Sequence, residues 1–137
     1  MKKIFLDTII ILDLIILRKP FHYDAKTIFK KAADKELILY ISALTFANVN
    51  YIISKSISGS DRRNLLQKLR MQVSILDLNE KIIELALNDT DFTDVEDGFQ
   101  YYTAVENKIN TILTRDEKDF SASIISVLTP KEFLAAL

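Results

Sequence analysis

Residues 94–120 read DVEDGFQYYTAVENKINTILTRDEKDF, and this stretch decides how we interpret the rest of the chain. It predicts a helix that opens on acidic residues, a tight turn, a short apolar strand at 111–113 and a second acidic cluster after that strand. In an open parallel sheet, the carboxyl ends of strands and the amino ends of neighbouring helices meet at one edge, where ligands bind. Asp97 and Asp116 are therefore expected to face one crevice. Carboxylates placed that close repel one another unless a cation lies between them.

The composition is that of a compact globular protein. A chain of 137 residues with 49% hydrophobic residues, 2 Gly and 2 Pro predicts a single domain over 1–137 without a linker. The formal net charge of -1 and a pI near 5.8 leave no general basic field to hold nucleic acid. Any contact with nucleic acid must therefore be local.

The cysteine and histidine content excludes several kinds of site. Cysteine is absent, which excludes disulfides, thiolate nucleophiles and Cys-type zinc sites, and the single histidine, His22, cannot form a His-rich metal site. No small-residue cleavage site follows the apolar start, as a signal peptide would require. The apolar run Ile9–Leu17 is shorter than the roughly 18 residues of a membrane span. We therefore expect a cytoplasmic protein with no membrane partner.

The N-terminal segment allows two interpretations. As a buried parallel strand, Lys2–Thr8 would bring Asp7 to the edge where the later acids lie, but Asp7 could equally be only the cap of the next helix. The β-branched residues of Ile9–Leu17 favour a strand, whereas its length and unbroken continuation favour a buried helix. A turn at Thr8 is needed if Asp7 ends a strand, so we interpret the run as a helix.

The rest of the chain alternates between helical and strand patterns. Helices are expected at Tyr23–Lys35, from an N-cap at Ser42 to about Ser56, at Asp61–Met71, from an N-cap at Asn79 through Leu87 and at Pro130–Leu137. Strands are expected at Leu37–Ile41, Val73–Leu78 and Ile124–Leu128. This alternation predicts a parallel sheet that is covered by helices on both faces.

Acidic motifs recur at predicted strand ends and helix starts. Asp7 follows the first strand, Asp94-Val-Glu-Asp97 opens the late helix, and Thr114-Arg-Asp116-Glu-Lys-Asp119-Phe120 follows the next strand. In this order and placement the chain resembles the PIN domain family over essentially its whole length, most closely the small bacterial members that include the VapC-type toxins. The resemblance implies an α/β fold, a three-layer α/β/α sandwich with a central parallel sheet. It also implies a metal-dependent endoribonuclease that uses Mg²⁺ or Mn²⁺ to cleave RNA, an antitoxin protein as partner, and a homodimer.

The resemblance also assigns site residues, position by position. Asp7, Asp97 and Asp116 match the acids that bind metal and carry catalysis, and Asp119 matches a neighbouring acid that shares the metal-binding role. Residues beside the acids, or on the substrate side, are Thr8, Thr45, Asn48, Asp94 and Thr114. Carboxylates are ligands that hard cations prefer, and such an ion can activate a water to attack a phosphodiester.

Two departures from the family pattern leave an alternative open. Ile9 stands where Asn is common, and Asn48 stands at or near the place of the second acid, usually Glu. An amide can coordinate through its carbonyl but brings no charge, so metal binding should be weaker. The alternative is a degenerate, catalytically weak PIN domain that binds RNA or a protein. The acids could also be ordinary caps, and a phospho-acceptor receiver domain is disfavoured because Leu6-Asp7 lacks a pair of acids.

The expected dimer has a basis in the apolar residues as well. Ile9–Leu17 and the helical segment Tyr51–Ile57 offer more hydrophobic surface than a chain this short buries easily. We expect a homodimer that covers part of this surface.

Overall fold

A five-stranded sheet organises the computed structural model, which describes residues 1–137. The strands are β1 (Lys2–Leu6), β2 (Leu37–Ser42), β3 (Ser74–Leu76), β4 (Thr111–Leu113) and β5 (Ser126–Leu128). Their order is β3-β2-β1-β4-β5, and every neighbouring pair is parallel. The chain first builds outward on one side of β1 and later on the other, so the order reverses between β1 and β4. Such a switch point opens a crevice at the carboxyl edge of a parallel sheet.

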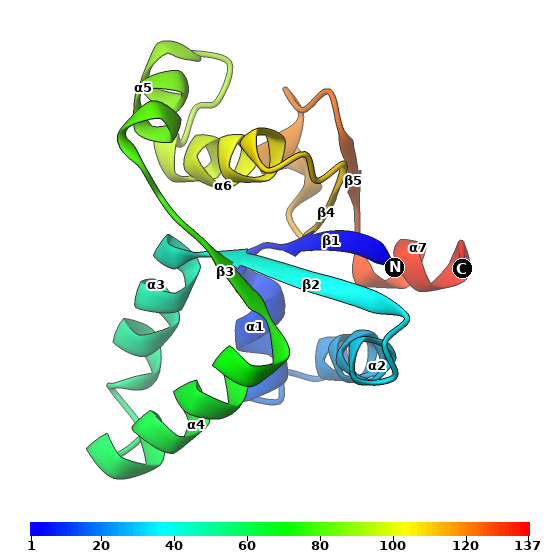
Figure 1. Ribbon diagram of the computed structural model, residues 1–137. Helices are drawn as coiled ribbons and strands as arrows, with labels where there is room; N and C mark the ends of the chain where they lie inside the picture. The colour runs from blue at the N-terminus through cyan, green and yellow to red at the C-terminus, as the bar shows by residue number, and fades with distance from the viewer.

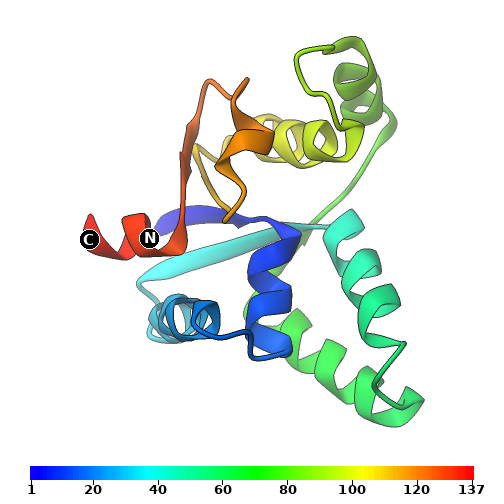
Figure 2. The same ribbon diagram turned by 180° about the vertical axis from the view of Figure 1, so that it is seen from behind.

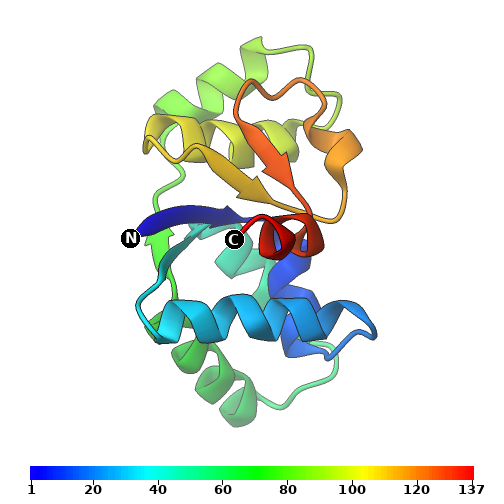
Figure 3. The same ribbon diagram turned by 90° about the vertical axis from the view of Figure 1, so that its right-hand side faces the viewer.

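Helices cover both faces of this sheet (Figure 1). The first four are α1 (Thr8–Ile15), α2 (Phe21–Ala33), α3 (Ala43–Ile53) and α4 (Gly59–Gln72). The others are α5 (Glu80–Asn88), α6 (Val95–Glu106), the 3-10 helix η1 (Glu117–Phe120) and α7 (Pro130–Ala135). In Figures 1 and 2, α5 and α6 lie above the sheet and α1 to α4 below it, which confirms the three-layer α/β/α prediction. The short α7 packs against α2 and β5 (Figure 3).

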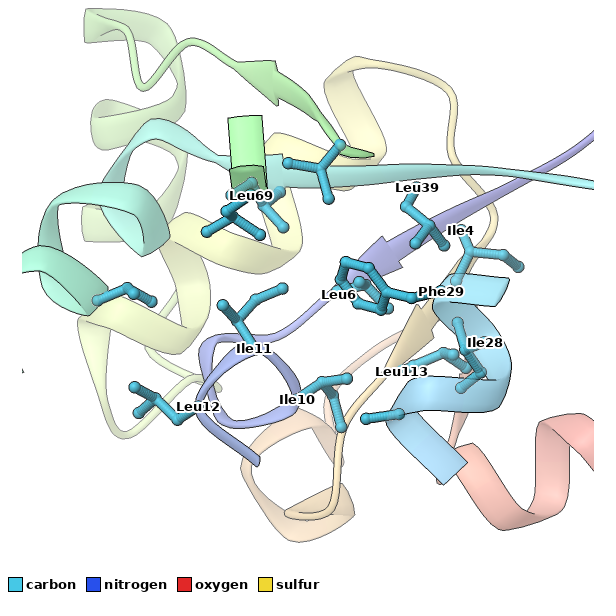
Figure 4. Close-up of a cluster of buried hydrophobic side chains, with 14 of the residues drawn as sticks. Ile4, Leu6, Ile10, Ile11, Leu12, Ile28, Phe29, Leu39, Leu69 and Leu113 are labelled. Atoms are coloured by element: carbon cyan, nitrogen blue, oxygen red, sulfur yellow. The ribbon is translucent and has the colours of Figure 1, made fainter. Parts of the chain in front are cut away.

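Each face of the sheet has its own hydrophobic cluster. Ile4 and Leu6 of β1 point into the larger cluster, on the side of α1 to α4, while Phe5 between them points into the cluster beneath α6. Figure 4 shows the larger cluster, in which β1 meets Ile10 and Ile11 of α1. A central strand buried on both faces explains why β1 is a continuous apolar run rather than an alternating one.

Side chains that follow the strands cap the helices that come next. Asp7 accepts a hydrogen bond from the Thr8 backbone N–H, Ser42 from that of Thr45, and Asn79 from that of Ile82. The strand interpretation of the N-terminal segment is confirmed, because Asp7 directly follows β1, and Asp7 also caps α1. The helical interpretation of Ile9–Leu17 is confirmed through Ile15.

Strand boundaries account for the main errors in the predicted secondary structure. The strand expected at Val73–Leu78 covers only Ser74–Leu76, because only these residues find partners on β2. The strand expected at Ile124–Leu128 begins at Ser126, because the Ser123 hydroxyl accepts a hydrogen bond from the Ile125 N–H and forms a local turn. The helix η1 was not predicted. No helix combines the length and the apolar character needed to cross a membrane.

Candidate active site at the carboxyl edge of the sheet

Most of the predicted site residues line a crevice and a neighbouring hollow at the switch point between β1 and β4, whereas Thr45, Thr114 and Asp116 line neither. Asp7 follows β1, Thr114 and Asp116 follow β4, and Asp97 lies in the first turn of α6. An open pocket of about 380 Å³ occupies this edge. Its polar lining comes from Asp7, Thr8, Asn48, Asp94, Glu96, Asp97 and Gln100. A neighbouring hollow is lined by Asp94, Asp97 and Asp119, so Asp97 stands between the two.

Two threonines hold the Asp7 carboxylate in place. One oxygen accepts the Thr8 backbone N–H at 2.9 Å, and the other accepts the Thr114 hydroxyl at 2.8 Å. The Thr114 hydroxyl in turn accepts the Asp116 backbone N–H at 3.0 Å, which joins the ends of β1 and β4. Burial raises the pKa of Asp7, the bonds from Thr114 and Thr8 oppose that rise, and the charges of Asp116 and Asp119 add to it.

Burial and four neighbouring carboxylates shift the pKa of Asp97. Burial and then repulsion from Asp119, Asp94, Asp7 and Glu96 raise its pKa to about 7. Repulsion of this kind requires that the carboxylates of three separate chain segments face the same space. A divalent cation in that space would remove the repulsion, because it would neutralise the charges that cause it.

The acids surround the crevice but do not converge into a ready-made cage. No three acidic or histidine side chains come close enough together in this arrangement to hold an ion between them. The Asp7 carboxylate is instead directed toward Thr8 and Thr114. The side chains available as ligands offer oxygens of carboxylates, hydroxyls and amides, and oxygen ligands fit Mg²⁺ or Mn²⁺.

Comparison of the chain with known proteins identifies its family. The family model for the PIN domain matches residues 3–118. The chain belongs to the PIN domain family. It is similar to "Ribonuclease VapC1" of Aquifex aeolicus (strain VF5), with 34% identity over 140 residues that cover 96% of this chain and 93% of that protein.

Solved structures share the fold at low sequence identity. VapBC-1 from nontypeable Haemophilus influenzae matches with a TM-score of 0.72 and 17% identity, over 94% of this chain and 98% of that chain. FitAcB from Neisseria gonorrhoeae matches with a TM-score of 0.69 and 22% identity, over 93% and 98%. VapBC2 from Rickettsia felis, bound to a promoter DNA fragment, matches with a TM-score of 0.68 and 18% identity, over 92% and 96%.

A buried polar network, which the sequence analysis missed in part, fixes three helix starts of this PIN domain. The Gln100 amide donates to the hydroxyls of Thr45 at 2.6 Å and Thr8 at 3.2 Å, and its carbonyl accepts the Ser42 hydroxyl at 2.5 Å. The Thr8 and Thr45 hydroxyls lie 2.8 Å apart. The network joins α1, α3 and α6 directly behind the acids. Gln100 could have been suspected from the sequence, because it lies three residues after Asp97 on the same helix face.

A second missed feature anchors the loop that carries Asp116. The Arg115 guanidinium donates two hydrogen bonds to Asp13 of α1, at 2.7 and 3.0 Å, and its carbon lies 3.7 Å from the centre of the Phe21 ring. Asp13 is 1% exposed, which explains the one acid within the apolar run Ile9–Leu17. This PIN domain thus holds the β4 end against α1 by a bidentate ion pair.

Asn48 is the residue that stands at or near the expected place of the second acid. It sits on α3 at the pocket, and its amide donates to the Glu96 carboxylate at 3.3 Å. Sequence analysis overlooked Glu96, although it stands next to Asp97 in the stretch quoted first.

Proposed function

We propose that this PIN domain is an endoribonuclease that uses Mg²⁺ or Mn²⁺ and acts as the toxin of a toxin–antitoxin pair. The observation that carries the proposal is the acidic crevice at the switch point, where burial and neighbouring carboxylates raise the pKa of Asp97 to about 7. Identity of 34% to a ribonuclease over almost the whole chain supports the reaction class. The VapBC and FitAB neighbours, some of them bound to DNA, support an antitoxin partner.

Each residue would have a distinct role in this reaction. Asp7, Asp97 and Asp116 would hold the ion, with Asp119 as an auxiliary acid beside Asp97. When bound, the ion supplies an activated water and a counter-charge for the phosphate oxygens. Thr8 and Thr114 keep the Asp7 carboxylate directed, through the hydrogen bonds described above.

Three further residues would shape the crevice around the acids. Asp94 caps α6 by accepting the Glu96 backbone N–H at 2.9 Å, and so places the first turn that carries Asp97. Asn48 presents its side chain from α3 to the pocket, on the side where substrate would enter, whereas Thr45 is buried behind it and supports the crevice through its hydrogen bonds to Gln100 and Thr8. With a net charge of -1, the chain would bind RNA through such local contacts and the ion rather than through a general basic field.

Assembly and location complete the proposal. Tyr51 and Ile52 on α3 are 64% and 38% exposed, and Ile16 and Leu17 after α1 are 42% and 54% exposed. We propose that a homodimer covers part of this apolar surface, and that the protein works in the cytoplasm, where RNA is available. Light scattering at tens of micromolar protein would report a dimer, and a monomer there would contradict this part.

The decisive experiment is cleavage of single-stranded RNA by the purified chain with Mg²⁺ or Mn²⁺. Cleavage should require the ion, stop with EDTA, and be lost in Asp97→Asn and Asp116→Asn, while Asp119→Asn should lose less. Cleavage that persists with EDTA and in Asp97→Asn would refute the proposed site. RNA binding without cleavage, on several RNAs and with both ions, would favour the alternative of a catalytically weak binding module.

A further inference from the structure

Asn48 and Glu96 form a polar pair across the mouth of the crevice. Asn48 comes from α3 and Glu96 from the first turn of α6, and the amide nitrogen lies 3.3 Å from the carboxylate oxygen. Both side chains line the same pocket as Asp7 and Asp97. The acid that the family pattern leads one to expect on α3 is therefore absent, but a carboxylate stands directly beside its position.

No other role in the fold uses the Glu96 carboxylate. Asp94 already caps α6 through its own side chain. The ion pairs of the chain join Arg18 and Arg115 to Asp13, Lys30 to Asp34 and Lys81 to Glu106, so none of them engages Glu96. Its one side-chain partner is a neutral amide, which directs the carboxylate without neutralising it. Glu96 thus has no ion-pair partner, although it stands next to Asp97 on the lining of the same pocket.

We propose that Glu96 supplies the cation site with the negative charge that Asn48 cannot, and that Asn48 is a positioning residue that holds Glu96 toward the crevice. The carboxylate that the family pattern places on α3 then comes from α6. This inference rests on the proposed function, because it assumes a divalent cation among Asp7, Asp97 and Asp116. Asn48 then marks more than a lost ligand, because its amide orients the Glu96 carboxylate that replaces that ligand.

Mn²⁺ binding to the whole chain, measured without RNA by electron paramagnetic resonance of the free ion, tests the proposal. Glu96→Gln keeps the size and the acceptor for Asn48 but removes the charge, and should weaken Mn²⁺ binding about ten-fold, within the range for one carboxylate near a cation. Asn48→Ala should weaken binding less, because Glu96 keeps its charge and loses only its fixed direction. Glu84→Gln on the exposed side of α5 is the matched control and should leave binding unchanged.

A double variant tests whether the two positions are interchangeable. Asn48→Glu combined with Glu96→Gln moves the carboxylate from α6 to α3 and should restore most of the affinity lost in Glu96→Gln. Failure of the double variant to recover affinity would overturn the claim that Glu96 replaces an α3 acid. Glu96 is exposed, so these changes should not prevent folding, and circular dichroism would verify this.

The Asp97→Asn variant separates this inference from the proposed function. If Asp97→Asn abolishes Mn²⁺ binding while Glu96→Gln matches Glu84→Gln, the inference about Glu96 is overturned and the cation site stands. If Asp97→Asn also leaves Mn²⁺ binding unchanged, the crevice is not the cation site and the proposed function fails with it.

Discussion

Replacing Asp13 by Asn should destabilise the protein more than any change at an exposed ion pair. Asp13 is 1% exposed and accepts two hydrogen bonds from Arg115, at 2.7 and 3.0 Å. The hydrogen bond with Asp13 is also the main reason why the pKa of Arg115 lies above its ordinary value. Asp13→Asn keeps the shape but leaves the positive charge of Arg115 without its partner.

The expected magnitude follows from the burial of the pair. Breaking a buried ion pair by removing one partner costs about 3–5 kcal/mol, and the lower end applies because Arg115 is 20% exposed and can reach water. For a chain of 137 residues, a loss of about 3 kcal/mol corresponds to a fall of about 10 °C in Tm. Arg18→Gln should cost less than about 1 kcal/mol, because Arg18 is 41% exposed and lies 3.7 Å from Asp13.

Thermal and urea unfolding of Asp13→Asn and Arg18→Gln, and of Asp13→Leu and Arg115→Met separately and combined, would test this reasoning. Asp13→Leu combined with Arg115→Met removes both charges and should regain most of the stability, since an apolar pair of similar volume can replace a buried ion pair. The reasoning is refuted if Asp13→Asn loses no more stability than Arg18→Gln. It is equally refuted if the loss of unfolding free energy in the double variant equals the sum of the losses in Asp13→Leu and Arg115→Met.

The remaining predictions concern the crevice. Thr114→Val should raise the pKa of Asp7 further and reduce RNA cleavage, because it removes a hydrogen bond that favours the ionised form; a cleavage profile against pH would show the shift. Gln100→Leu should cost about 1–3 kcal/mol in urea unfolding, because it removes three hydrogen bonds between Gln100 and the hydroxyls of Ser42, Thr45 and Thr8. The folded pKa of Asp97 is about 7 against an ordinary 3.8, so the metal-free protein should lose stability as pH rises between these values, and Asp97→Asn should flatten that slope. At pH values above 7, millimolar Mg²⁺ or Mn²⁺ should raise the Tm, and a Tm that is unchanged by both ions would count against the cation site.

Local interactions explain what the sequence alone could determine. The strand at Thr111–Leu113 was predicted with its observed bounds, and Ser42 and Asn79 were identified as helix caps, because a cap bonds to a backbone N–H only a few residues away. The alternation of strand and helix patterns was enough for a parallel sheet with helices on both faces. The placement of Asp7, Asp97 and Asp116 at one edge followed from that topology, since all strands of a parallel sheet end on the same side.

Tertiary packing decided what those residues do at that edge. Asn48 and Glu96 are 48 residues apart in the chain, Thr8 and Gln100 are 92 apart, and Asp13 and Arg115 are 102 apart. No local pattern signals such pairs, because each bond depends on how two helices or a helix and a strand end are placed against each other. Sequence therefore located the acids, whereas only the packed structure showed that Asn48 donates a hydrogen bond to a neighbouring carboxylate and that Asp13 belongs to an anchor for the β4 end.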